Sequence, residues 1–215
     1  MTAPALSTKA FITLLFLACL FGANHVAARV AMDHGVDVTT AVAARSLATA
    51  LVVGLLVAWS RIPIALNSRQ KRFMLAIGLL VTVQSVWLYS SVALIPVGLA
   101  LLSFNSYPLW AAFASWLLYR RAPPRAVLIA MPLILAGLAL ALDVTGIATG
   151  LGAQAQWERM GKGVAYAVGA GATFGLVLAL TQHEVAALDG RVRSALTMAI
   201  VGVLALAGAL AQGGL

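Results

Sequence analysis

Residues 93–119 read ALIPVGLALLSFNSYPLWAAFASWLLY, a stretch without a charged side chain that ends directly at Arg120 and Arg121. An α-helix rises about 1.5 Å per residue and the hydrocarbon core of a bilayer is about 30 Å thick, so about 20 apolar residues cross it once. The quoted stretch is long enough to cross, and the two arginines mark its end. It therefore predicts a membrane-spanning helix.

Six further apolar stretches lie along the chain. The 215 residues are 62% hydrophobic and 9% charged, with a mean hydropathy of +1.00, which leaves too little polar surface to cover a water-soluble globule. We therefore predict an all-α polytopic membrane protein with about seven transmembrane helices. They are expected at residues 10–30, 39–60, 73–91, 93–119, 126–142, 163–182 and 194–211.

The first stretch has a second interpretation, because Lys9 precedes its apolar core and residues 16–19, FLAC, resemble a lipoprotein cleavage site. The apolar run continues past Cys19, which favours an uncleaved first helix. Cys19 is the only cysteine, so the sequence excludes an intramolecular disulfide and a paired-cysteine metal site.

Basic residues stand between the apolar stretches. The net charge of +8 comes from 14 Lys and Arg against 6 Asp and Glu. A nucleic-acid-binding protein would gather such residues on one folded face, so no nucleic-acid partner is expected. Basic loops tend to stay in the cytoplasm, which predicts a cytoplasmic amino terminus. The basic residues at that terminus and in every second connection are Lys9, Arg61, Arg69, Lys71, Arg72, Arg120, Arg121, Arg125, Arg191 and Arg193.

Arg45 is the charged residue that falls well inside a predicted span, away from its ends. It lies roughly 9 Å from the outer end at about 1.5 Å per residue. Insertion scales assign a guanidinium at a helix centre a cost of about 2.5 to 3.5 kcal/mol. Two interpretations stay open, because the side chain can either snorkel to the outer headgroups or contact an anion inside a central cavity.

Three other polar residues share the depth of Arg45: Asn24, His25 and Gln84 are each about two-thirds of the way towards the outer face, by the same rise per residue. These side chains either line a cavity or form hydrogen bonds between helices. His25 and Arg29 are four residues apart and are expected on one helix face, where they would extend this polar layer as a stripe to the outer surface. His25 either couples to a proton gradient or acts as a neutral hydrogen-bonding residue.

Residues 103–108, SFNSYP, lie near the middle of the fourth span. Pro108 lacks a backbone donor and its ring clashes with the carbonyl of Phe104, so we expect a kink that frees this carbonyl. Kinked helices near the midplane are a recurring way to build transport sites, although a purely structural kink fits the sequence as well.

Small residues repeat in the sixth span, where Ala167, Gly171 and Gly175 are four positions apart and allow close backbone approach. The His, Cys and carboxylate residues show neither nucleophile–base nor metal-ligand spacing. The sequence therefore predicts no enzyme activity, no cofactor and no metal site.

Three segments together resemble the EamA-type repeat of the drug/metabolite transporter superfamily. Residues 21–29 and 39–51 are similar to the family's first two helices. In residues 89–140, the motifs VALIPVGLA (92–100), YPL (107–109) and ILAG (134–137) follow one another at the family's spacing. One departure is that the family places a glutamate at the end of its fourth helix, where this chain reads LYRR (118–121).

The resemblance implies a secondary transporter of small metabolites, such as an exporter of amino acids or drug-like compounds, that works by alternating access in a bacterial inner membrane. It implies a five-helix repeat at residues 10–142, an extracytoplasmic linker at 143–161 and a partial, inverted second repeat at 162–215. It leaves open coupling to protons or substrate exchange, and assembly as a homodimer. The candidate substrate-binding residues are Asn24, His25, Arg45, Gln84, Asn105 and Tyr107, with Pro108 at the kink.

Two other readings of the chain stay open. Family members of this type have ten helices, so the chain is expected to be truncated after its seventh helix and could be an inactive or scaffolding membrane protein. A seven-helix membrane enzyme or sensor is disfavoured because the catalytic constellation is missing.

Overall fold

The computed structural model describes residues 7–123, 125–143, 145, 147–148, 150 and 152–213, and over these residues the protein is helical without a strand. The all-α prediction is therefore confirmed. The helices are α1 (Thr8–Asp33), α2 (Val38–Trp59), α3 (Ser68–Leu94), α4 (Val97–Phe104), α5 (Tyr107–Tyr119), α6 (Arg125–Ala141), α7 (Ala153–Glu184) and α8 (Gly190–Ala211).

Six segments of the described chain are long and apolar enough to cross a membrane. They are α1, α2, α3, the α4–α5 pair, α7 and α8. Helix α6 is apolar too, but it has only 17 residues. A helix or helix pair thus lies at each of the seven predicted spans, and α4 with α5 makes up the fourth.

Polar residues start most of the long helices. The side chains of Ser7, Asp37 and Asn67 accept hydrogen bonds from the first turns of α1, α2 and α3, and Asp189 does the same for α8. Such N-caps satisfy backbone N–H groups that have no partner within the helix. Pro96 separates α3 from α4, because it cannot donate a backbone hydrogen bond.

The N-cap of α2 lies outside the spans and has a perturbed acidity. Desolvation raises the pKa of Asp37, but hydrogen bonds from the Thr39 and Thr40 side chains and backbone outweigh it and lower the pKa to about 2. The Thr40 backbone N–H lies 2.9 Å from the carboxylate. The cap is therefore ionised over the whole physiological pH range.

Helix α7 begins earlier than the sequence indicated. Residues 153–162 were expected in the linker or just after it, but they are helical and continue into the apolar part of α7. Polar composition marks the end of the membrane-embedded region and does not end a helix, because Ala, Gln and Glu are good helix formers. The buried Gln156 side chain also donates to the carbonyl of Leu142 at 3.1 Å, which ties the start of α7 to the end of α6. Residues 144, 146, 149 and 151 of the expected linker lie outside the described residues.

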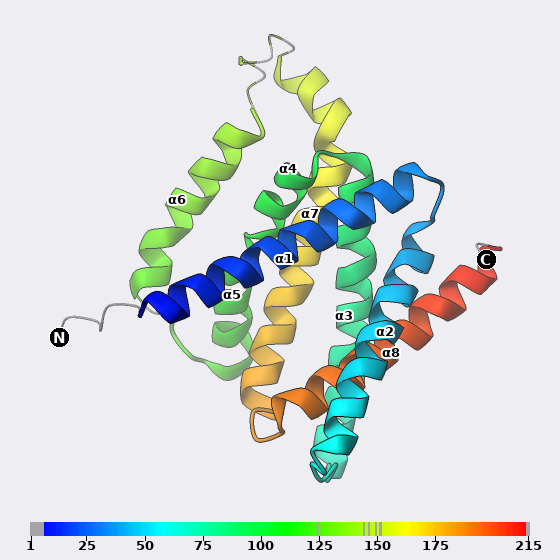
Figure 1. The fold of residues 1–215 in the computed structure, drawn as a ribbon. Helices are drawn as coiled ribbons and strands as arrows, with labels where there is room; N and C mark the ends of the chain where they lie inside the picture. The colour runs from blue at the N-terminus through cyan, green and yellow to red at the C-terminus, as the bar shows by residue number, and fades with distance from the viewer. Residues whose placement is uncertain are drawn as a thin grey trace.

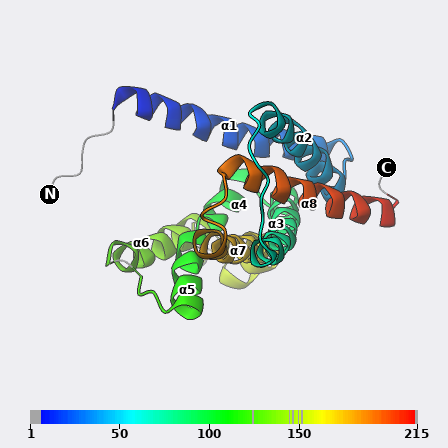
Figure 2. The same ribbon diagram turned by 90° about the horizontal axis from the view of Figure 1, so that it is seen from below.

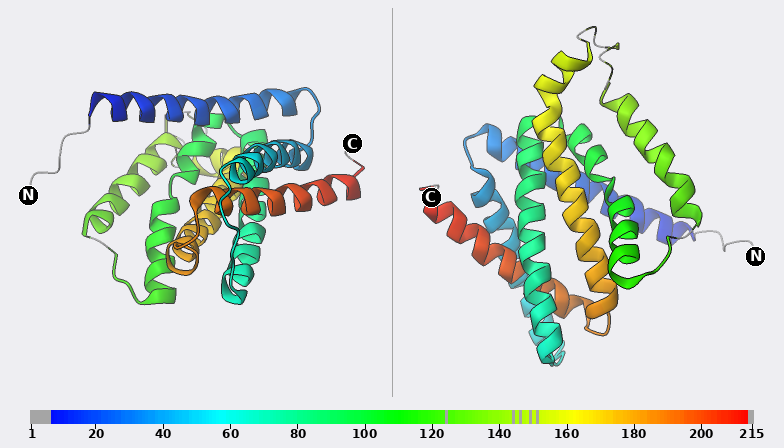
Figure 3. Two further views of the ribbon diagram at one scale, coloured as in Figure 1. Left: turned by 60° about the horizontal axis from the view of Figure 1, so that its bottom comes forward. Right: turned by 180° about the vertical axis from the view of Figure 1, so that it is seen from behind.

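The helices form one bundle with two peripheral members. Helix α7 lies between α3 and α5, and α2 packs along α8 (Figure 1, and from behind in Figure 3). Seen from below, α1 runs along one edge of the molecule, and α4 and α8 lie between α1 and α7 (Figure 2). Residues 8–21 of α1 are all exposed, and Leu138 is the buried residue of α6. These two helices therefore present mostly apolar surface to the lipid.

The small residues of α7 allow the α4–α5 segment to approach it closely. A Cβ atom added to Gly175 would lie 2.6 Å from the backbone nitrogen of Ala111. At Gly171 it would lie 2.9 Å from the carbonyl oxygen of Phe104. The spacing of small residues in the sixth span thus predicted a real helix–helix contact.

Candidate functional site

The fourth span is interrupted between α4 and α5. Helix α4 ends at Phe104, and Asn105 and Ser106 form a turn before α5 begins at Tyr107. Pro108 occupies the first turn of α5, where its missing N–H would have no intrahelical partner anyway. The sequence predicted a kink at Pro108, and the structure interrupts the span just before it, at Asn105 and Ser106. In a continuous helix the proline ring would clash with the carbonyl of Phe104.

A cavity of about 790 Å³ lies beside this interruption. Helices α1, α2, α3, α7 and α8 and the α4–α5 turn contribute its walls. At one end it is lined by Val185, Gly190 and Arg193, where α7 connects to α8, and this connection is at the bottom of Figure 1. Five of the six candidate residues from the sequence line the cavity: His25, Arg45, Gln84, Asn105 and Tyr107.

Asn24 does not line the cavity, although it neighbours it. Its side-chain amide donates to the hydroxyl of Tyr89 at 3.3 Å, and Tyr89 is a lining residue. Asn24 therefore holds a cavity wall in place from α1, which is an indirect role.

Arg45 points across to α3. Its guanidinium donates to the hydroxyl of Ser85 at 3.3 Å, and its central carbon lies 5.1 Å from the centre of the Tyr89 ring. The Nε atom is buried and has no hydrogen-bond partner among the described residues. The Arg45 guanidinium is thus directed into the cavity wall and has unused donor capacity.

His25 lies in the same layer and is only 1% exposed. Its ring packs edge-on against Phe21, with centroids 4.8 Å apart, and against Tyr89, with centroids 5.7 Å apart. Neither ring nitrogen has a hydrogen-bond partner in the described part of the chain. Because a neutral imidazole always carries one N–H, His25 also offers a donor at this depth.

Several lining residues were missed by sequence reasoning. Phe104 and Phe174 are two of them, and they form an aromatic cluster with the candidate residue Tyr107, in which ring centroids are 5.1 to 5.6 Å apart. Arg193 lines the end of the cavity and donates to the carbonyl of Val185 at 3.2 Å. Ser85 could have been found from the sequence, because it lies four positions before Tyr89 and next to Gln84 on the same part of α3.

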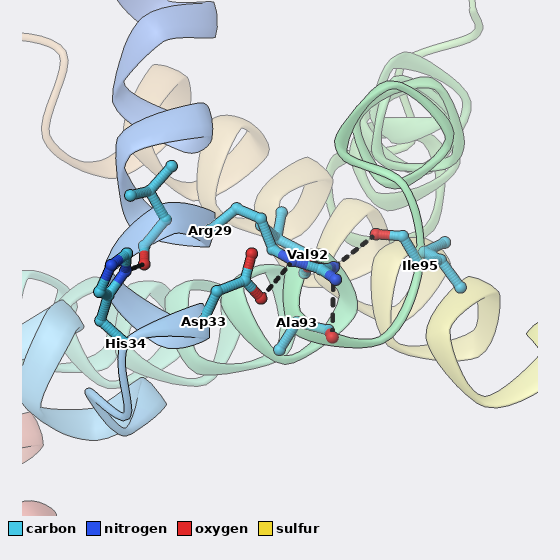
Figure 4. Close-up of polar contacts among 7 residues, drawn as sticks. Arg29, Asp33, His34, Val92, Ala93 and Ile95 are labelled. Atoms are coloured by element: carbon cyan, nitrogen blue, oxygen red, sulfur yellow. Dashed lines mark hydrogen bonds and ion pairs between the residues drawn. The ribbon is translucent and has the colours of Figure 1, made fainter.

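Arg29 lies outside the cavity and links α1 to α3. One guanidinium nitrogen donates to the carbonyls of Val92, Ala93 and Ile95, at 2.7, 3.3 and 3.4 Å, and Nε pairs with the carboxylate of Asp33 at 3.0 Å (Figure 4). A cation at the last carbonyls of a helix is favourable, because those oxygens carry partial negative charge and have no intrahelical partner. Arg29 therefore fastens α1 to the end of α3.

A second polar cluster links α3, α5 and α7 at the amino-terminal end of α3, opposite the end that Arg29 contacts. The Glu184 side chain at the end of α7 is 5% exposed and pairs with Arg69 of α3 at 2.8 Å. It also accepts a hydrogen bond at 2.9 Å from Tyr119 of α5, whose ring stacks on His183 with centroids 3.9 Å apart. The fourth span has no acidic residue at its own end, and an acidic residue of α7 contacts that end.

The described residues hold no group of three or more His, Cys, Asp or Glu side chains that could bind a metal ion. The model of the EamA-like transporter family matches residues 8–142, which include α1 to α6. Comparison with curated proteins and with solved structures gave no match.

Proposed function

Because the chain belongs to the EamA-like transporter family, we propose that it is a secondary transporter of small metabolites and that the cavity is its substrate site. Membership in this family makes the chain an integral membrane protein that acts on small molecules in a lipid environment, and the family consists of transporters rather than enzymes. Export of amino acids or drug-like compounds by alternating access is the specific activity that we propose.

The observation that carries this proposal is the convergence of polar residues on one cavity. His25, Arg45 and Gln84 come from three different helices and lie in one wall region, while Asn105 and Tyr107 come from the broken span. Polar groups at membrane depth are costly unless they have partners or line a watery space. A broken helix at such a cavity is a common construction of transport sites, because it brings unpaired backbone groups and side chains to the substrate.

We also propose the orientation of the chain. The connections α2–α3, α5–α6 and α7–α8, together with the helix ends that adjoin them, carry most of its basic residues, which supports a cytoplasmic position for them and for the amino terminus. The cavity reaches the α7–α8 connection, so in this conformation it would face the cytoplasm. A bacterial inner membrane is the location we propose.

The domain division is part of the same proposal. Residues 10–142 would form the first repeat, and residues 162–215, which hold most of α7 and all of α8, would belong to a second repeat of inverted direction. The opposite chain directions of α2 and α8, which pack side by side, support this arrangement (Figures 1 and 3). Rocking of the two repeats about a site between them would expose the cavity to alternate sides.

Transport into vesicles tests the proposal. The purified chain is reconstituted and offered a panel of labelled amino acids and metabolites, beside Asn105→Leu and the control Gln182→Leu. Gln182 is exposed on α7 and does not line the cavity. We expect saturable uptake that Asn105→Leu loses and Gln182→Leu keeps. No saturable uptake by the folded, inserted wild-type chain would favour an inactive or scaffolding membrane protein.

A further inference from the structure

The charged residues that line the cavity are Arg45 and Arg193, and both are cationic. We infer that the cavity binds an oxyanion, the carboxylate or phosphate of a small molecule with a flat apolar body. The oxyanion would contact Arg45, and the apolar body would lie against Phe104, Tyr107 and Phe174. This inference rests on the proposed transport function and names the substrate class of the same cavity.

Arg45 has no anionic partner in the described structure. Its contacts are the neutral hydroxyl of Ser85 and the face of the Tyr89 ring, and its buried Nε donates to nothing. A guanidinium stays protonated at any physiological pH, so it cannot lower its cost by losing a proton. Removing one partner from a buried charge is expensive, and an incoming oxyanion would supply the partner that is missing.

The acidic residues of the chain do not line the cavity and have contacts elsewhere. Asp33 pairs with Arg29, Asp37 caps α2, Glu184 pairs with Arg69, and Asp189 caps α8. Asp143 and Glu158 accept hydrogen bonds from Ala148 and Gln154, outside the cavity. The cavity thus holds no carboxylate from these residues that could neutralise Arg45 or receive a substrate cation.

Neutral donors beside Arg45 complete an oxyanion site. His25 is 1% exposed, and one of its two unpartnered ring nitrogens must carry a hydrogen. The Tyr89 ring contacts both the His25 ring and the Arg45 guanidinium, so the two side chains flank the same residue. Charge-assisted hydrogen bonds to an oxyanion are about twice as strong as neutral ones, which favours such a ligand over an amide or an alcohol.

The absence of a lining carboxylate also narrows the proposed substrates, because it favours drug-like anions over zwitterionic amino acids. A zwitterion would satisfy Arg45 with its carboxylate, but its ammonium group would find only aromatic faces and neutral dipoles. Arg193 at the cavity end would attract an anion and repel a cation. The cavity volume of about 790 Å³ is ample for a small aromatic acid.

Equilibrium dialysis of the purified full chain in nanodiscs of zwitterionic lipid tests the inference. The labelled probes are phenylacetate, its neutral analogue phenylacetamide, zwitterionic phenylalanine and cationic phenethylamine. We expect phenylacetate to bind at least about tenfold more tightly than each of the others, the size expected for a charge-assisted contact. Arg45→Gln should abolish the preference over phenylacetamide, and Arg45→Lys should keep part of it. Arg72→Gln, on an exposed basic residue outside the cavity, should change nothing.

Equal binding of phenylacetate and phenylacetamide would overturn the inference, as would a preference that survives in a correctly folded Arg45→Gln variant. Loss of phenylacetate binding when phosphatidylglycerol is added to the nanodiscs would overturn the inference that the ligand is a soluble molecule and would assign the oxyanion to a lipid headgroup.

Vesicle uptake separates this inference from the transport proposal. Uptake of phenethylamine without phenylacetate binding leaves transport standing and overturns the anion site. Tight phenylacetate binding without uptake supports the anion site and contradicts transport.

Discussion

Substitution of Gly175 by alanine should weaken the packing of α5 on α7. The added Cβ atom would lie 2.6 Å from the Ala111 nitrogen and from the Trp110 Cβ, and 2.7 Å from the Trp110 carbonyl carbon. Ordinary contacts of this kind begin near 3.4 Å, so the two helices would have to separate by several tenths of an ångström. Two of the three neighbours are backbone atoms, and no side-chain rotation can move them away.

The expected loss of stability follows from two opposing effects. Overpacking of a close contact costs typically about 1 to 3 kcal/mol, and the backbone clash places this case at the upper end. Alanine recovers up to about 1 kcal/mol relative to glycine inside a helix. The net destabilisation should therefore be about 2 kcal/mol.

Unfolding of the purified protein in mixed micelles, followed by circular dichroism, measures this difference. The matched control is Gly54→Ala in α2, where an added Cβ atom meets nothing within 4 Å. The control should be as stable as the wild-type chain or slightly more stable. If Gly175→Ala were as stable as Gly54→Ala, the close approach of α5 to α7 would be wrong.

Three further substitutions test other contacts. Arg29→Gln should remove charged hydrogen bonds at the end of α3 and cost about 1 to 2 kcal/mol, with faster hydrogen exchange in α1; unchanged exchange would contradict the tether. Tyr119→Phe should cost about 1 kcal/mol by removing the donor to Glu184, and an unchanged unfolding midpoint would argue against that bond. Asp37→Ala should cost about 1 kcal/mol at neutral pH. Because the folded-state pKa of Asp37 is lowered to about 2, its stabilisation is present above the unfolded-state pKa of about 3.9 and disappears as the pH falls towards 2, so the two chains should converge there in a pH series.

The sequence predicted the helical architecture well because the physics of the bilayer acts directly on composition. Long apolar stretches must form helices in lipid, so each predicted span corresponds to a helix or a helix pair. Pro108 likewise predicted a distortion of the fourth span, which is interrupted between α4 and α5. The predicted span began at residue 163, whereas α7 begins at Ala153. Hydropathy indicates how deep a residue lies in the membrane, but it does not indicate where a helix begins outside the membrane.

The candidate site was partly accessible from depth alone. Arg45, His25 and Gln84 were grouped because they share a level in the membrane, and the structure brings them to one cavity. The depth of a residue in the membrane does not indicate which face of its helix it occupies. Arg29 was therefore expected to extend the polar layer, whereas it caps α3, and Phe174 was missed because an apolar residue in an apolar span carries no signal of which face it occupies.

The most direct test of the central claim, that the broken span lines a water-accessible substrate cavity, is thiol labelling by a membrane-impermeant reagent. The native Cys19 is exposed on the lipid-facing part of α1 and provides an internal control. In right-side-out and inside-out vesicles, Asn105→Cys should be labelled from the side to which the cavity opens, and the wild-type chain with only Cys19 should stay unlabelled. Asn105→Cys that reacts no more than Cys19 from either side would contradict the account.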